Sequence, residues 1–314
     1  MDKFVIHGGS RLQGEVKIGG SKNAALPLIA AAILAPGKYT ITNVPPITDI
    51  LTMCKLLRMM GGEGRVEDEV LYLDSSEVDK YEAPYELVKT MRASIYVLGP
   101  LLARFGQAAV SLPGGCAWGP RPVNLHIEGM KKLGAEIDLD RGYIVAKAKK
   151  LRGAEIDLAF PSVGATGNIL MAAVKAEGET IINNAACEPD VTALVDFLVS
   201  MGAKIEGAGT PVLRITGSAE LAPGDFNNIP DRIEAGTFMI AGAITGGEIT
   251  LNNCRADHCE KVISKLQNAG CMIESGRDRI TVKRNGELKP VDVTTAVYPG
   301  YPTDLQAQWI ALMA

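Results

Sequence analysis

The chain has 314 residues, of which 47% are hydrophobic but only 5% aromatic, and its formal net charge is −4 at pH 7. This length predicts about two domains, and cores built mainly from aliphatic side chains are typical of layered α/β proteins. The negative charge argues against a nucleic-acid partner, because a phosphate backbone requires a basic surface. No apolar run approaches the roughly 18 residues of a membrane span, and no signal layout is visible, so we expect a cytoplasmic protein without a membrane partner.

Two glycine marks recur with a period of about 70 residues, which indicates internal repetition. The first mark precedes a strand pattern and consists of Gly37, Gly106, Gly178 and Gly247. The second mark follows a helix pattern and consists of Gly61, Gly134, Gly202 and Gly270. A glycine at the end of a helix is the usual helix stop. The marks therefore divide the chain into similar units, each containing a helix, a strand, a second helix and two more strands.

The helices of each unit differ in polarity. The first helices are apolar and are expected to be buried; they are predicted at residues 23–34, 93–104, 166–175 and 236–244. The second helices are amphipathic and are expected outside; they are predicted at residues 48–59, 123–132, 191–199 and 261–268. A fifth first helix begins at Thr303, and its glycine would fall near residue 317, so we interpret the sequence as truncated at Ala314.

One copy breaks the pattern. The strand after the first mark ends in Asn43, Asn184 or Asn253 in three copies, but in Leu112 in the second copy. Leu112 opens a loop rich in glycine and proline that contains Cys116 and, five residues later, Arg121. A thiol beside a fixed positive charge has a lowered pKa and becomes a nucleophile or a proton donor. The loop is therefore a candidate catalytic segment.

The other cysteines do not indicate a metal or a disulfide scaffold. Six cysteines are too few for a disulfide framework in a chain of this length. Cys254, His258 and Cys259 lie close in sequence, but their spacing is not that of a zinc site. Cys54 lies on an apolar stripe and is predicted to pack in the core.

Polar residues gather where the apolar first helices begin. They are Ser21, Lys22, Asn23, Arg92, residues 162–166, Arg232, Glu234, Thr303 and Asp304. Equivalent positions of successive repeats are expected on one shared face. Helix N-termini carry partial positive charge and unpaired N–H groups, so this face should bind phosphate or carboxylate. The order Gly19-Gly20-Ser21-Lys22 is not that of a P-loop.

Six segments together resemble the UDP-N-acetylglucosamine 1-carboxyvinyltransferases of the enolpyruvyl transferase family. They are residues 20–27 (GSKNAALP), 87–94 (LVKTMRAS), 112–116 (LPGGC), 121–123 (RPV), 162–166 (SVGAT) and 302–308 (PTDLQAQ). The resemblance implies an α/β fold, an inside-out α/β barrel built from repeated βαβαββ units in two domains. Residues 21–228 would form the catalytic domain of three repeats that carries the lid. Residues 1–20 and 229–314 would form the second domain, truncated within its second repeat.

The implied enzyme transfers enolpyruvyl from phosphoenolpyruvate to the 3′-hydroxyl of UDP-N-acetylglucosamine, the first committed step of peptidoglycan synthesis. Its wider setting would be cell-wall biogenesis, cell shape, the cell cycle and cell division, and it would be a target of fosfomycin. The resemblance implies a monomer whose partners are the two substrates, with no metal and no organic cofactor.

The resemblance also implies roles for single residues. Lys22 and Arg121 would neutralise the phosphate of phosphoenolpyruvate, and Asn23 would position the reacting groups. Cys116 would be the general acid at C3 of phosphoenolpyruvate, and Asp304 would accept the proton of the 3′-hydroxyl. An acid and a base on opposite sides suit this chemistry, because protonation at C3 makes C2 open to attack by the alcohol. The residues implied to bind the nucleotide sugar are Arg92, Arg121, Pro122, Val123, Asn124, Leu125, Ser162, Val163, Gly164 and Asp304.

Two departures and two alternatives accompany this interpretation. Phe160 stands where some members carry a lysine that faces the nucleotide sugar, and arginines that grip phosphoenolpyruvate would lie beyond Ala314. The first alternative is the sister reaction on shikimate 3-phosphate by a 3-phosphoshikimate 1-carboxyvinyltransferase. The second is a non-catalytic regulatory paralogue or an inactive fragment.

Overall fold

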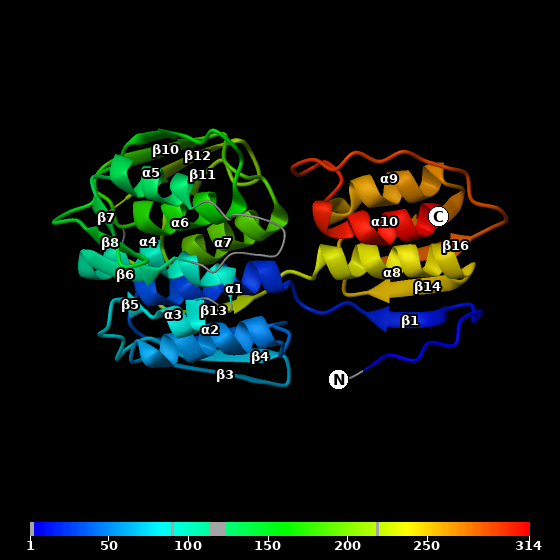
Figure 1. Ribbon diagram of the computed structural model, residues 1–314, viewed down its shortest axis with the longest axis horizontal. Helices are drawn as coiled ribbons and strands as arrows, with labels where there is room; N and C mark the ends of the chain where they lie inside the picture. The colour runs from blue at the N-terminus through cyan, green and yellow to red at the C-terminus, as the bar shows by residue number, and fades with distance from the viewer. Residues whose placement is uncertain (1–2, 89–90, 113–122, 218–219) are drawn as a thin grey trace. The chain divides into compact units, whose positions relative to one another are not determined.

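The computed structural model describes residues 3–88, 91–112, 123–217 and 220–314. They form two compact units, one of Gly20–Ile229 and one that combines Met1–Gly19 with Pro230–Ala314; both are drawn in Figure 1. We call them the larger and the smaller unit. None of the described helices is both long and apolar enough to cross a bilayer.

The larger unit contains three four-stranded sheets with the same strand order. In each sheet a parallel edge strand pairs with the strand after the first glycine mark, which pairs antiparallel with the last strand of the repeat. The first sheet is β13 (Asp225–Asn227), β2 (Lys38–Thr42), β4 (Val70–Asp74) and β3 (Glu63–Glu67). The second is β5 (Glu82–Ala83), β6 (Gln107–Ser111), β8 (Tyr143–Lys147) and β7 (Glu136–Asp140). The third is β9 (Glu155–Asp157), β10 (Glu179–Asn183), β12 (Val212–Thr216) and β11 (Lys204–Glu206).

The smaller unit has one sheet of the same design. Its order is β1 (Gln13–Lys17), β14 (Glu248–Asn252), β16 (Arg279–Arg284) and β15 (Cys271–Ser275). Strand β1 comes just before the first repeat in the sequence, yet it pairs with β14, whereas β13 pairs with β2. Figure 1 shows blue β1 beside yellow β14. The parallel edge strands of these two sheets are therefore exchanged: β1 precedes β2 in the sequence but belongs to the sheet of β14, and β13 precedes β14 but belongs to the sheet of β2.

In the larger unit the first helices lie inside and the sheets outside, which is the inside-out α/β barrel arrangement expected from the resemblance, whereas α8 of the smaller unit (Arg232–Thr245) is only partly buried. The first helices are α1 (Lys22–Ala31) with η1 (Ala32–Leu34), η2 (Arg92–Val97) with α4 (Leu98–Phe105), α6 (Val163–Ala173) and α8. In α1 and α6 nearly every residue beyond the first turn is buried, as their apolar sequences predict. The short elements that complete the fold are α3 (Tyr85–Val88), η3 (Ala256–His258), η4 (Thr303–Leu305) and α10 (Gln306–Met313).

The single α-helix predicted at 93–104 is wrong in its first half. Residues Arg92–Val97 form a 3₁₀ helix, and the α-helix begins only at Leu98. Pro100 explains the change, because its ring would clash with the carbonyl of Tyr96 and it has no N–H to donate there. Beginning at Leu98 places Pro100 in the first turn of α4, where a missing N–H costs nothing.

The second helices begin and end within two residues of their predicted bounds. They are α2 (Thr48–Met59), α5 (Asn124–Lys132), α7 (Pro189–Ser200) and α9 (Glu260–Asn268). Their expected outside position is wrong for α7, which contacts both α1 and α6 and buries most of its length. Leu194, Phe197 and Leu198 are among its core residues. The prediction that Cys54 of α2 packs in the core is confirmed.

The repeat marks have a backbone cause. The glycines of the second mark all have positive φ, with values of 101° at Gly61, 92° at Gly134, 109° at Gly202 and 101° at Gly270. A left-handed residue ends a helix, and glycine adopts this conformation without a steric penalty. The helix stops expected at these four glycines are therefore confirmed.

The strand-ending asparagines share a conformation and a contact. Asn43, Asn184 and Asn253 have φ of 57°, 56° and 54°. Each side-chain amide donates to the carbonyl just beyond the parallel edge strand: Asn43 to Asn228 (2.9 Å), Asn184 to Leu158 (2.8 Å) and Asn253 to Ile18 (2.7 Å). Asparagine tolerates the left-handed region better than most residues. Leu112, in the second copy, makes no such bond, so the break in the repeat extends to the structure.

Candidate functional site

Contacts at the N-terminal turns join five helices of the larger unit in pairs. Lys22 begins α1, and its Nζ atom lies 3.1 Å from Oδ2 of Asp49 in the first turn of α2. Ser21 caps α1 and donates from Oγ to Oδ1 of Asp190, in the first turn of α7, at 2.7 Å. The entrances of α2, α1 and α7 are therefore neighbours.

The entrances of α7, α6 and α5 are joined in the same way. The backbone N–H of Ala186, just before α7, donates to Oγ1 of Thr166 in α6 at 3.1 Å. The ring of His126 in α5 lies against Gly164 in the first turn of α6. Each helix N-terminus presents unpaired N–H groups and partial positive charge. The larger unit thus gathers donors suited to phosphate or carboxylate groups.

Ser162, Val163 and Gly164 form the entrance of α6. Ser162 is the N-cap, and its Oγ accepts from the backbone N–H of Ala165 at 3.3 Å. Gly164 has ordinary helical backbone, so its smallness matters for space. A Cβ atom there would lie 3.2 Å from both Cε1 and Nε2 of His126. Glycine therefore permits the close approach of α5 to α6.

Two buried polar side chains lie behind this entrance. His126 is 4% exposed and Asn168 is fully buried. Nδ2 of Asn168 lies 3.0 Å from Nδ1 of His126 and 2.7 Å from the carbonyl oxygen of Ile95, and Oδ1 accepts from the N–H of Gly99 at 2.6 Å. These contacts connect α4, α5 and α6 behind the helix entrances.

The entrance of α5 holds three further predicted binding residues. Val123 is its N-cap residue and is half-buried, and Asn124 is exposed. Leu125 is half-buried and lines an open groove of about 460 Å³ between α5 and β9. Ile156 and Leu158 form its apolar wall. The groove offers an apolar surface beside the predicted nucleotide-sugar residues.

The predicted phosphoenolpyruvate residues differ in exposure. The Lys22 side chain is 38% exposed and paired with Asp49, whereas Asn23 is exposed. Phe160, the first of the two departures expected from the resemblance, is 56% exposed. An aromatic ring there can cover a ligand by stacking but cannot supply a positive charge.

The predicted base, Asp304, belongs to the smaller unit. It is exposed on η4, where its neighbour Leu305 is buried. Leu305 packs against Gly236 of α8, where any Cβ atom would collide with it. This close packing fixes the short helix that carries Asp304.

The first turn of α8, which contains Arg232 and Glu234, is held by hydrogen bonds within the smaller unit. Oδ1 of Asp231 caps α8 by accepting from the N–H groups of Ile233 (2.8 Å) and Glu234 (3.0 Å). Oε2 of Glu234 accepts from the N–H of Gly19 at 2.8 Å. Glu234 therefore links the segment after β1 to α8, because its carboxylate accepts a hydrogen bond from within the smaller unit.

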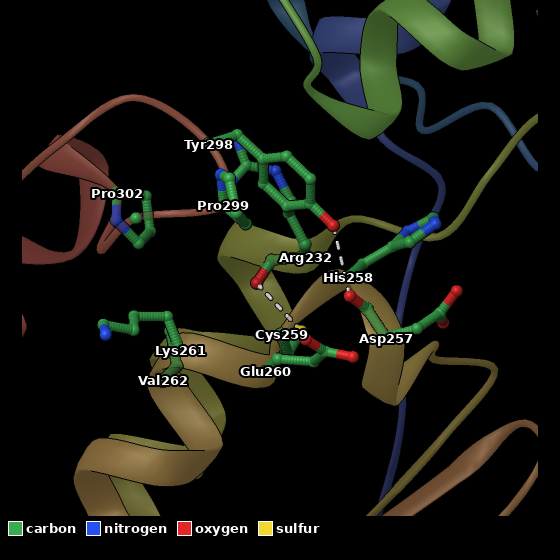
Figure 2. Close-up of a pocket in the computed structure, with 11 residues that line it drawn as sticks. Arg232, Asp257, His258, Cys259, Glu260, Lys261, Val262, Tyr298, Pro299 and Pro302 are labelled. Carbon is green, nitrogen blue, oxygen red and sulfur yellow. Dashed lines mark hydrogen bonds between the residues drawn. The ribbon is translucent and has the colours of Figure 1, made fainter. Parts of the chain in front are cut away.

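A small pocket of about 20 Å³ lies beside Arg232 in the smaller unit. Figure 2 shows the hydroxyl of Tyr298 directed at the carbonyl of Asp257, a bond of 3.2 Å, and Cys259 beside the carbonyl of Arg232. The Arg232 guanidinium lies 5.7 Å from the centre of the Tyr298 ring. The pocket is thus closed by contacts among its own lining residues.

Burial determines the protonation states of Cys259 and His258, which line this pocket. It raises the pKa of the Cys259 thiol to about 12 and lowers the pKa of His258 to about 4, the latter with help from Arg255. A thiol with a pKa of about 12 does not give its proton to an imidazole with a pKa of about 4, so these two groups do not supply a thiolate nucleophile at neutral pH. Among the described residues no three His, Cys, Asp or Glu side chains are grouped as a metal ion would require.

Several predicted site residues lie outside the described residues. They are Cys116, Arg121 and Pro122, and of Arg92 only the backbone, at the start of η2, is described. The described candidates fall in two places: Lys22, Asn23, residues 123–125 and residues 162–164 in the larger unit, and Asp304 in the smaller unit.

The sequence interpretation missed Asp49, His126, Asn168 and Asp190. Asp49, His126 and Asn168 lie within predicted helices, and Asp190 lies one residue before the predicted start of its helix, but none matched a motif. The available signal was a polar side chain on an apolar helix face, most clearly Asn168 within the apolar run of α6. Such a residue must find a partner when buried.

Comparison with known proteins places this geometry in context. Residues 6–314 match the family described as EPSP synthase (3-phosphoshikimate 1-carboxyvinyltransferase). Proteins named UDP-N-acetylglucosamine 1-carboxyvinyltransferase are 51% identical in Geotalea uraniireducens (strain Rf4) and 54% identical in Chlorobium chlorochromatii (strain CaD3). Both alignments cover 100% of this chain and 75% of the relative.

Solved structures have the same fold. The enolpyruvyl transferase NikO from Streptomyces tendae matches with a TM-score of 0.86 and 27% identity, over 98% of this chain and 74% of that one. An EPSP synthase from Acinetobacter baumannii matches with a TM-score of 0.70 and 20% identity, over 90% of this chain and 67% of that one. The second likeness concerns the fold alone.

Proposed function

The chain belongs to the EPSP synthase family of enolpyruvyl transferases, and from this premise we propose that it transfers enolpyruvyl from phosphoenolpyruvate to the 3′-hydroxyl of UDP-N-acetylglucosamine. The observation that carries the proposal is the similarity of the whole chain, at 51–54% identity, to relatives named for that reaction. The joined helix entrances of the larger unit support it, because both substrates are anionic.

In this proposal Lys22 and Arg121 bind the phosphate of phosphoenolpyruvate, and Asn23 positions the reacting groups. The position of Lys22 in the first turn of α1 supports this assignment, because its ammonium group adds a full positive charge to the partial positive charge of the helix N-terminus. Positive charge held in place needs little reorganisation when the phosphate binds.

The nucleotide sugar would lie along the entrances of α5 and α6. Ser162, Val163 and Gly164 would supply backbone donors to its diphosphate, as helix N-termini commonly do. The apolar groove beside Leu125 supports placing an aromatic base nearby. The other residues in this role are Arg92, Arg121, Pro122, Val123, Asn124 and Asp304.

Proton transfers would complete the reaction. The Cys116 thiol gives a proton to C3 of phosphoenolpyruvate, and positive charge develops at C2. The 3′-oxygen of the sugar attacks C2 while Asp304 accepts its proton. Loss of phosphate from C2 and of one proton from C3 then restores the double bond. No step in this sequence requires a metal or an organic cofactor.

We infer the cellular setting from the same premise. The product would enter peptidoglycan synthesis, and the enzyme would be a cytoplasmic monomer whose activity serves cell-wall biogenesis, cell shape, the cell cycle and cell division. A thiol in a phosphate-binding site would also make it a target of fosfomycin.

Calorimetry with the two candidate acceptors tests the proposal. We expect UDP-N-acetylglucosamine to bind and shikimate 3-phosphate not to bind. Preferential binding of shikimate 3-phosphate would assign the chain to the sister reaction for which the family is named. Binding of UDP-N-acetylglucosamine without phosphate release from added phosphoenolpyruvate would favour a non-catalytic protein or an inactive fragment.

A further inference from the structure

We propose that Asp190 is a positioning residue for Lys22. Its carboxylate holds Ser21, the N-cap residue of α1, and so fixes the point from which the Lys22 side chain extends toward the phosphate of phosphoenolpyruvate. The structural half, that Asp190 orders the first turn of α1 through Ser21, depends only on contacts within the larger unit. The ligand half rests on the proposed function, in which Lys22 binds that phosphate.

The hydroxyl of Ser21 makes two hydrogen bonds of opposite kind. Its Oγ atom accepts from the backbone N–H of Ala24 at 3.2 Å and donates to Oδ1 of Asp190 at 2.7 Å. A backbone N–H can only donate, so the single hydroxyl proton remains for Asp190. Asp190 therefore directs this proton away from α1 and leaves an oxygen lone pair to cap the helix.

Burial makes the bond between Ser21 and Asp190 consequential. Both residues are buried, so water does not readily replace either partner when the other is removed. Asp190 lies in the first turn of α7, where the partial positive charge of the helix N-terminus favours an acidic side chain. The acceptor for Ser21 is thus supplied by a second helix at a place that suits a carboxylate.

The backbone of Ser21 is also held on both sides. Its N–H donates to the carbonyl of Ile229 at 2.7 Å. Its carbonyl accepts from the N–H of Ala25 at 3.0 Å and from Nδ2 of Asn228 at 3.0 Å. Ser21 therefore has partners for its N–H, its carbonyl and its hydroxyl, and among these partners Asp190 is the one that belongs to another helix.

Lys22 follows Ser21 directly and is the first residue of α1. A lysine side chain is long and flexible, so the place of its ammonium group depends on a backbone that does not move. A displacement of about 1 Å at a residue that orients substrate can weaken its contribution severely. Loss of the bond that orders the N-cap should therefore weaken the contact of Lys22 with a phosphate.

Charge alone makes the opposite prediction for Asp190. Removing a negative charge near a cationic site should strengthen anion binding, as it should for Asp49, which contacts the ammonium group of Lys22 itself. If Asp190 acts by holding Ser21, removal of its acceptor weakens anion binding in spite of the lost charge. Asp190→Asn separates the two effects, because an amide oxygen still accepts from the Ser21 hydroxyl but carries no charge.

Calorimetry with phosphoenolpyruvate tests the ligand half. We expect Asp190→Ala and Ser21→Ala each to raise its dissociation constant about tenfold, and the double variant to be no weaker than either single one. Asp190→Asn should stay within about threefold of the unaltered chain, and UDP-N-acetylglucosamine should bind all variants within about threefold. Tighter binding of phosphoenolpyruvate to Asp190→Ala, or an equal loss for both ligands, would overturn the positioning role.

Ser75→Ala is the matched control. Ser75 is a buried serine of the same unit, and its hydroxyl donates at 2.9 Å to the carbonyl of Ala35, which follows the other end of the helix formed by α1 and η1. We expect its melting temperature to fall about as much as that of Ser21→Ala, without a change in phosphoenolpyruvate affinity. A tenfold loss of affinity in Ser75→Ala as well would contradict a specific role of Asp190.

Hydrogen exchange of the free protein tests the structural half without a ligand. The amide of Ala24 donates to Oγ of Ser21, so we expect it to exchange about tenfold faster in Asp190→Ala and in Ser21→Ala, but not in Asp190→Asn. Unchanged protection of Ala24 in Asp190→Ala would overturn this half. If phosphoenolpyruvate does not bind the unaltered chain, the ligand half fails with the proposed function, whereas the exchange of Ala24 still decides whether Asp190 orders the turn.

Discussion

Nζ of Lys22 lies 3.1 Å from Oδ2 of Asp49, so the cation at the entrance of α1 is paired with a carboxylate at the entrance of α2. Both side chains are 38% exposed, and pairs of this kind stabilise a fold by at most about 1 kcal/mol. The pair therefore matters more for the charge of the entrance than for the stability of the larger unit.

Asp49→Asn should strengthen anion binding at this entrance. The change removes the negative charge beside Lys22, so we expect phosphoenolpyruvate to bind several-fold more tightly, while the free energy of unfolding changes by less than about 1 kcal/mol. Calorimetry and urea unfolding measure the two effects. Lys22→Ala is the control, because in its background the Asp49 substitution should lose most of its effect; an equal effect in both backgrounds would show that the two residues act independently.

Gly164→Ala should separate ligand binding from stability. The added Cβ would press on the His126 ring at 3.2 Å, so we expect UDP-N-acetylglucosamine to bind about tenfold more weakly, the loss of about one well-aligned hydrogen bond. Helix propensity favours alanine over glycine and should offset the strain in unfolding experiments.

Gly242→Ala is the matched control for this substitution. Gly242 lies in α8 of the smaller unit, and its added Cβ would meet the Ile249 side chain at 3.3 Å. Comparable stability of both variants with weaker binding only in Gly164→Ala would agree with the assignment. Weaker binding in both would point to a general disturbance.

Asn184 should be replaceable by glycine at a smaller cost than by alanine. Asn184→Gly keeps the positive φ and loses the bond to the carbonyl of Leu158, which we expect to cost about 1 kcal/mol. Asn184→Ala also forces an alanine into the left-handed region, which adds about 1 kcal/mol. Urea unfolding measures both values, and equal costs would mean that the backbone conformation is not what selects asparagine.

Acid should destabilise the smaller unit through His258. Burial, followed by the nearby charge of Arg255, lowers the pKa of His258 from 6.5 to about 4. Between these values the unfolded chain binds a proton that the folded chain does not, so stability falls as pH decreases from 6.5 to 4. We expect His258→Gln to show a shallower fall in melting temperature over this range, and an unchanged slope would assign the effect to other groups.

Cys116 should be the most reactive thiol toward a phosphonate epoxide such as fosfomycin. Burial raises the pKa of the five described cysteines, to about 11 for Cys54 and Cys254, to about 12 for Cys259, and in the same direction for Cys187 and Cys271. Their reactive thiolates are therefore scarce near neutral pH. Peptide mass mapping after labelling locates the adduct, and an even distribution over the other cysteines would refute the assignment.

Two variants refine this test. Lys22→Ala should slow the alkylation, because the phosphonate requires the same positive charge as phosphoenolpyruvate. Cys116→Asp should keep an acid and lose the adduct, whereas Cys116→Ser should lose most activity, since a hydroxyl is a poor proton donor at neutral pH. Alkylation at the same rate without Lys22 would remove that residue from the phosphate site.

The sequence by itself determined the features that depend on single residues and their neighbours. The ends of the second helices could be predicted from single glycines, because the left-handed backbone conformation that ends a helix favours glycine whatever the surroundings. These glycines are Gly61, Gly134, Gly202 and Gly270. The apolar bodies of the first helices predicted their burial, and ordered motifs indicated the family. The tertiary structure was needed for the exchange of β1 and β13, because the partner of an edge strand is chosen by distant segments.

The same physical reason applies to the site. The contact between Asn168 and His126 joins residues 42 positions apart, and the amide of Asn168 is further held by backbone partners supplied by Ile95 and Gly99. The burial of α7 likewise depends on its packing against α1 and α6. Local patterns determine where helices begin and end, whereas only packing decides which polar side chains meet inside.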